Sequence, residues 1–159
     1  MYLGNIRHNI DVSNEYYMLA KKDEEVGNIL MERCEYRHAI YFFIQAMEKY
    51  IRAKIFRLVD PKLDYFRKRN QTHSIESAIE FLIDIISPDK NIQQQIKEQL
   101  NKYVLQNIKF QQLHNNLRYP YYSSKYNSYS VVDFGSLDCS GIYIKLHDLK
   151  DYLQELNRL

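Results

Sequence analysis

Residues 36–59 read YRHAIYFFIQAMEKYIRAKIFRLV, and this stretch decides the fold. Its apolar residues recur at the three- and four-residue spacing that places side chains on one face of an α-helix. The members of this broad stripe are Ala39, Phe42, Phe43, Ala46, Met47, Tyr50 and Ala53. Pro61 disfavours helical backbone in the residue before it, so the helix should end near residue 59. The stretch therefore predicts a long amphipathic helix with a wide buried face.

The composition agrees with a helical domain of 159 residues. Ile, Leu, Val and Phe supply 46 of these residues, which is enough apolar surface for a core and excludes disorder as the main state. The chain has only four Gly and three Pro, whereas β-rich folds need many turn residues. We therefore expect an all-α protein rather than a β-sandwich or a β-barrel.

The same helical periodicity continues on both sides of this stretch. It predicts helices over 14–33, 75–86 and 91–117, and a last helix through 146–156. Short connections then favour an up-and-down antiparallel bundle of about five helices. The whole chain, 1–159, should form a single domain. Its core should span about 14–158, with the helices at 36–59 and 91–117 as the central packing pair.

Three segments lack this periodicity. Residues 64–71 are a basic, polar link, and residues 141–144 are a short apolar piece that could form a strand. Residues 119–132 contain five tyrosines, and Pro120 prevents a helix from continuing through them. We interpret this last segment as an ordered tyrosine-rich loop.

Charge and cysteine content exclude several classes of protein. The formal net charge of +2 gives no strong overall field, and two cysteines do not make a disulfide framework. Cys34 and His38 share a helix face, but a structural zinc needs about four ligands. The chain has no apolar run of about 20 residues for a bilayer, and its first ten residues lack the apolar centre of a signal peptide. We expect a cytoplasmic protein with no membrane contact, no metal and no cofactor.

One segment is locally basic. Residues 33–69 carry ten Lys or Arg against four acids, and Tyr50, Phe56, Tyr65 and Phe66 are interleaved with these charges. Cations beside aromatic rings supply the phosphate and stacking contacts that single-stranded RNA needs. The alternative is a solvated helix face whose bulky residues point into the core.

Three motifs resemble the HEPN domain family. Residues 36–53 contain a tyrosine, an aromatic stretch, Gln-Ala, Glu-Lys and a closing Arg-Ala, and are similar to the second helix of HEPN domains. Residues 72–75, Thr-His-Ser-Ile, resemble the start of the third helix of the family, and residues 117–120, Leu-Arg-Tyr-Pro, resemble its Arg-Tyr-Pro element after the fourth. The likeness spans about 14–158 and implies an up-and-down helical bundle that commonly dimerises.

The resemblance implies two kinds of function. Some members of the family are metal-independent ribonucleases, and others are partners of small nucleotidyltransferases or have lost activity. Active members carry Arg, four to six residues and then His, where His deprotonates a ribose 2′-hydroxyl and Arg neutralises the developing phosphorane charge. In this chain Arg33-x4-His38 and Arg67-x5-His73 have that spacing, but both lie at expected helix junctions rather than at the position of the family motif.

His114 and Arg118, four residues apart near the end of a helix, are the nearest chemical analogue in reversed order. For a nuclease we expect His114 or His73 as the acid or base and Arg118 as the phosphate stabiliser. Candidate nucleic-acid contacts are Lys54, Arg67, Lys68, Arg69 and Tyr119. In the competing interpretation Arg118 pairs with an acid or bonds the last carbonyls of its helix, and His73 only begins the next helix.

We therefore expect a toxin or defence protein of prokaryotic type that binds RNA or a nucleotide as a homodimer, with a nucleotidyltransferase or an antitoxin as its partner. The alternative is a non-catalytic bundle that holds a partner protein or a small ligand with its tyrosine-rich loop.

Overall fold

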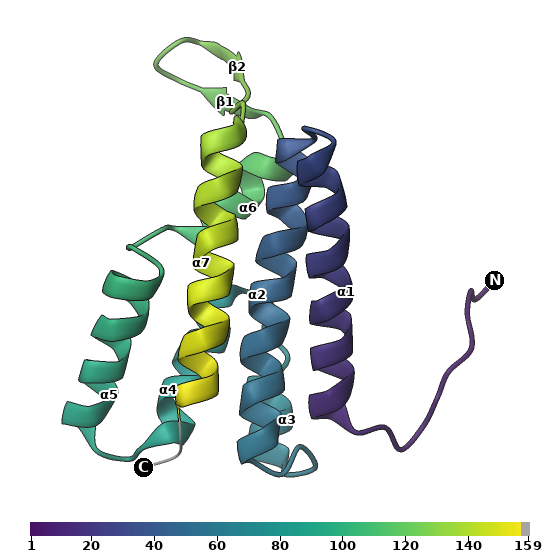
Figure 1. Cartoon of the computed structure of the whole chain (residues 1–159), viewed down its shortest axis with the longest axis vertical. Coiled ribbons are helices and arrows are strands. Elements are labelled where there is room, and N and C mark those ends of the chain that lie inside the picture. The colour runs from purple at the N-terminus through teal and green to yellow at the C-terminus, as the bar shows by residue number, and fades with distance from the viewer. Residues whose placement is uncertain (157–159) are drawn as a thin grey trace.

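The computed structural model describes residues 1–156 and is predominantly helical (Figure 1). Three long helices, α1 (Val12–Glu32), α2 (Tyr36–Leu58) and α7 (Ser136–Glu155), run along the length of the molecule. The shorter helices are α3 (Asp64–Arg69), α4 (Ile75–Ile86), α5 (Lys90–Glu98) and α6 (Phe110–Arg118), and a hairpin is formed by β1 (Tyr121–Ser123) and β2 (Ser128–Ser130). The all-α fold class is thus confirmed.

Short polar side chains begin several of these helices. The Asp11 carboxylate accepts a hydrogen bond from the Asn14 amide (3.2 Å) at the start of α1. The Ser74 hydroxyl accepts one from the Ser77 amide (3.0 Å) at the start of α4. Such caps satisfy backbone N–H groups that have no partner within the helix, so they fix where each helix begins.

Helix α2 is the centre of the core, where it packs against α1, α7 and α4. Every member of its apolar stripe is buried except Phe42, which is partly exposed, and Ala46 is completely buried. The stretch that we took to decide the fold therefore does form the central element.

The predicted single helix over 91–117 is wrong. Helix α5 passes into a π-helical segment, Gln99–Val104, and the chain then turns before α6 begins at Phe110. In this turn Gln106 and Asn107 adopt left-handed backbone, with φ of 52° and 57°. Residues spaced by four advance about 40° around a helix at each step, so the ladder from Ile92 to Ile108 would rotate away from the core along one straight helix. The break lets both ends of the ladder pack inward.

This break changes the packing that we predicted. The helix at 36–59 was expected to pair with that at 91–117, but α2 packs chiefly on α1, α7 and α4, and α6 is the part of the later region that contacts it. Three local predictions change as well. Residues 64–71 hold helix α3, the tyrosine-rich segment holds a hairpin, and residues 141–144 belong to α7 rather than to a strand. The expected end of the core at residue 158 lies outside the described residues.

No helix within residues 1–156 is long and apolar enough to cross a membrane.

Candidate functional site

A groove of about 370 Å³ lies between α2, α6 and the loop that leads into α4. Its lining includes all three candidate catalytic residues, His73, His114 and Arg118, which come from two separate parts of the sequence. The other lining residues are Tyr41, Ile44, Gln45, Glu48, Ser74, Ile75, Glu76, Phe110, Gln111 and Asn115. Two imidazoles, one guanidinium and two carboxylates therefore face one small volume.

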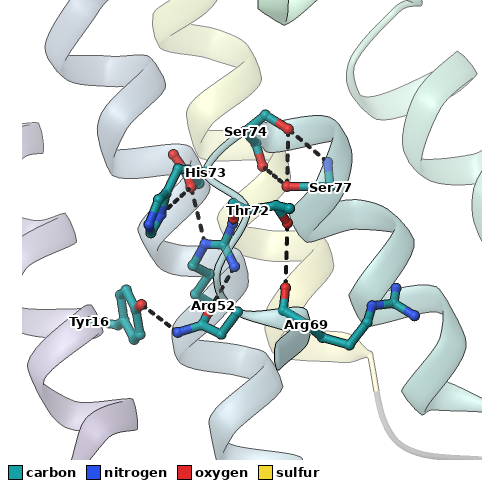
Figure 2. Close-up of polar contacts among 9 residues, drawn as sticks. Tyr16, Arg52, Arg69, Thr72, His73, Ser74 and Ser77 are labelled. Carbon is teal, nitrogen blue, oxygen red and sulfur yellow. Dashed lines mark hydrogen bonds and ion pairs between the residues drawn. The ribbon is translucent and has the colours of Figure 1, made fainter. Parts of the chain in front are cut away.

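The loop that carries His73 is held by a buried arginine (Figure 2). Arg52 of α2 is only 1% exposed, and its guanidinium donates hydrogen bonds to the Asn70 side chain (2.7 Å) and to the Thr72 carbonyl. Its Nε donates to Glu48 (3.1 Å). Asn70 in turn donates to the Tyr16 hydroxyl on α1 (2.9 Å). A buried cation with this many acceptors fixes the backbone on the N-terminal side of His73.

His73 itself is an accessible imidazole. Its side chain is 72% exposed, and its Nδ1 lies 3.9 Å from the nearer carboxylate oxygen of Glu48. Ser74, the next residue, caps α4. The interpretation of His73 as a residue at a helix start is therefore correct for the backbone, while its side chain is still free to act in the groove.

His114 occupies a more enclosed position on α6. Its ring stacks on Tyr41 of α2, with ring centroids 5.4 Å apart and planes 19° from parallel. Burial lowers the pKa of His114, and the nearby Arg118 lowers it further, while Glu48 and Glu76 act in the opposite direction. Its Nδ1 is buried and has no hydrogen-bond partner among the described residues. The lowered pKa means that the ring is uncharged at neutral pH and is able to accept a proton.

Glu76 joins the starts of two helices at the groove. One of its carboxylate oxygens accepts a hydrogen bond from the Gln111 amide at the start of α6 (2.9 Å). A carboxylate is favoured at that position because helix N-termini carry a partial positive charge. Its other oxygen, Oε2, is buried without a hydrogen-bond partner in the described part of the chain.

Arg118 does not close the end of its own helix. Its guanidinium donates to the Asn115 side chain (3.2 Å) and lies over the Tyr119 ring, 5.0 Å from the centroid. Arg37 of α2 instead donates to the carbonyls of Asn116 (2.9 Å) and Leu117 (2.8 Å). The structural role that we weighed for Arg118 thus belongs to Arg37. Arg118 remains exposed at the groove.

The candidate nucleic-acid contacts are dispersed. Arg67 and Lys68 on α3 both approach Asp64, and Arg69 pairs with Asp84 of α4 (2.6 Å). Lys54 lines a different hollow between α1, α2 and α7, and Tyr119 is exposed at the foot of the hairpin. Tyr119, which contacts Arg118, is therefore the nearest of the five to the groove. The basic segment 33–69 does not form one continuous cationic surface.

A larger hollow of about 730 Å³ adjoins the groove along α6. Amide and apolar side chains line most of it, and its only titratable lining residues among those described are Glu76 and Lys109. The smaller groove therefore holds more titratable side chains than the larger hollow does. In the described residues no three His, Cys, Asp or Glu side chains are grouped as metal ligands would be.

Some residues of this site had weak or no signals in the sequence. Gln45 and Glu48 are polar residues beside an aromatic stripe, a pattern that favours interhelical hydrogen-bond partners rather than catalysts. Arg37 and Arg52 were counted only as members of a basic segment, although the four-residue spacing of Glu48 and Arg52 is the signal of an ion pair on one helix face. Glu76 lies close to its groove partner Gln111 only after folding.

The fold and the groove define a helical-bundle protein with a site built from histidine and arginine. Comparison with family models identifies the family: the HEPN domain model matches residues 13–135, and the chain belongs to the HEPN domain family. This confirms the resemblance seen in the three motifs. Comparisons with curated proteins and with solved structures gave no significant match.

Proposed function

We propose that the groove binds RNA and cleaves it without a metal ion. One observation carries the proposal: His73, His114 and Arg118 line one groove. Membership of the HEPN family supports this function because some members are ribonucleases. In this proposal the protein acts in the cytoplasm as a homodimeric toxin or defence protein of prokaryotic type.

The groove supplies an acid, a base and an electrostatic stabiliser. Uncharged His114 takes the proton of a ribose 2′-hydroxyl, and the 2′-oxygen forms a bond to the adjacent phosphorus. The bond from phosphorus to the 5′-oxygen breaks, and this oxygen takes a proton from protonated His73. Arg118 neutralises the charge that develops on the phosphoryl oxygens. The products are a 2′,3′-cyclic phosphate and a 5′-hydroxyl, so no co-reactant is needed.

The test is a cleavage assay with purified protein and RNA in the presence of EDTA. His114→Ala should reduce cleavage by at least about a hundredfold, which is the usual scale for the loss of a general base. His38→Ala is the matched control, because His38 is exposed on α2, lies outside the groove lining and completes the spacing that begins at Arg33. Equal activity of wild type and His114→Ala would refute the proposal. Loss of activity only in His38→Ala would move the site to the junction of α1 and α2.

A second function is favoured by a different observation. Five tyrosines are exposed along the hairpin segment: Tyr119, Tyr121, Tyr122, Tyr126 and Tyr129. Such a surface suits a non-catalytic module that holds a nucleotidyltransferase, an antitoxin or a small ligand. This alternative predicts a wild-type protein that cleaves no RNA and a nucleotidyltransferase that co-elutes with it.

A further inference from the structure

The hairpin projects beyond the end of the helical bundle (Figure 1). Its tyrosines are unusually accessible for large aromatic side chains: Tyr126 is 68% exposed and Tyr129 is 76% exposed. In the basic segment 33–69 Tyr50 and Phe56 are buried, while Tyr65 is exposed. The hairpin segment therefore holds more exposed aromatic rings than the basic segment does.

The antiparallel register spreads the tyrosines over both faces of the hairpin. Tyr122 lies opposite Tyr129, and their rings meet edge to face with centroids 5.6 Å apart. Tyr121 lies opposite Ser130, and successive residues of a strand point to opposite faces. One face thus presents the pair of Tyr122 and Tyr129, and the other presents Tyr121 beside Ser130.

The foot of the hairpin is fixed to the groove. Arg37 donates hydrogen bonds to the Leu117 carbonyl before the hairpin and to the Val132 carbonyl after it. Arg118 lines the groove, and its guanidinium lies over Tyr119, the first tyrosine of the segment. A ligand that reaches Arg118 from the groove therefore meets the hairpin next.

The charged residues of the stretch that forms α6 and the hairpin have one sign. Residues 99–132, which include α6 and the hairpin, contain four cations and no Asp or Glu: Lys102, Lys109, Arg118 and Lys125. The absence of carboxylates in this stretch removes repulsion between the polypeptide and a phosphate backbone.

We propose that the hairpin is a stacking platform for unpaired bases of single-stranded RNA whose phosphate lies in the groove. The inference rests on the proposed function and narrows its substrate to single strands. Unpaired bases stack on any accessible aromatic ring, whereas the bases of a duplex are already stacked on one another. Tyrosine rings contact all four bases in this way, so the platform is tolerant of sequence.

The experiment measures binding separately from cleavage. The probe is a short fluorescent 2′-O-methyl RNA, which lacks the proton that the base removes, and binding is followed by fluorescence anisotropy. Tyr126→Ala and Tyr129→Ala should each weaken binding of the single strand about tenfold, the usual scale for losing one stacked base. Tyr129→Phe keeps the ring and should bind like wild type. Tyr103→Ala is the matched control, because Tyr103 is 70% exposed but lies outside the hairpin.

The outcomes separate this inference from the proposed function. Binding that depends on the hairpin rings, in a protein that cleaves no RNA, supports the platform and refutes the ribonuclease. Cleavage with unchanged binding by Tyr126→Ala and Tyr129→Ala supports the ribonuclease and overturns the platform. Equal losses on single-stranded and duplex probes also overturn it. A hairpin variant that binds RNA normally but dissociates from a dimer to a monomer also overturns the platform, because the rings would then contact a second copy of the chain. Failure of the wild type to bind overturns both.

Discussion

Arg118→Ala should strongly reduce cleavage while leaving the fold intact. The contacts that Arg118 makes are a hydrogen bond to Asn115 (3.2 Å) and the approach to the Tyr119 ring (5.0 Å), both at the surface. Exposed contacts of this kind contribute about 1 kcal/mol together, which lowers the melting temperature of a domain of this size by about 2–4 °C. Loss of the transition-state contact should reduce the cleavage rate about a hundredfold, or roughly 3 kcal/mol.

Arg37→Ala is the matched structural variant. Its guanidinium donates to three carbonyls, those of Asn116, Leu117 and Val132, and it lies over the Phe134 ring. Removing it leaves these partly buried acceptors unpaired and should cost about 3 kcal/mol, or about 6–12 °C in melting temperature. Melting curves and cleavage rates measured on the same samples separate the two roles. A large drop in melting temperature for Arg118→Ala, with cleavage falling only as far as unfolding explains, would refute the catalytic role.

Three further predictions follow from burial, charge and aromatic surface. Arg52→Ala should lower the free energy of unfolding by about 3–5 kcal/mol in urea titrations, because it leaves Glu48 and the Thr72 carbonyl without their buried cation. A change below about 1 kcal/mol would mean that other contacts hold the loop before His73. In Arg118→Ala the pKa of His114 should rise, since a cation that lowers it is gone, and an NMR titration in which this pKa stays constant would contradict the electrostatic argument. Tyr17, Tyr65 and Tyr103 are exposed outside the hairpin and predict a homodimer, so light scattering should give about twice 19.3 kDa rather than the monomer mass.

The sequence predicted those helices whose apolar stripe and boundary residues agree. Helix α4 spans Ile75–Ile86, as expected from Ser74 before it and Pro88 after it. The region 91–117 was mispredicted because its four-residue ladder contains no Gly or Pro to mark the break. Gln106 and Asn107 adopt left-handed backbone there, and only packing against the core requires it. A short-range pattern does not contain that information.

Three residues of the groove stood out in the sequence, but their arrangement did not. We singled out His73, His114 and Arg118 from motifs and spacing, and all three line one groove. Which arginine closes α6 was not predictable, because Arg37 and Arg118 are separated by about half of the chain and only folding places Arg37 beside the Leu117 carbonyl. The net positive charge counted over residues 33–69 was misleading for a similar reason. Asp84, which lies on a different helix, neutralises Arg69.

The hydrogen bonds of Arg37 to the backbone allow the hairpin sequence to diverge during evolution. A single side chain of α2 holds the backbone on both sides of the hairpin, so the loop is closed at its base whatever its length or composition. Insertions or exchanges between these two carbonyls leave the helical core and the histidines unchanged. Related proteins can therefore vary this surface loop, and an engineer can graft a different hairpin there, without redesigning the bundle.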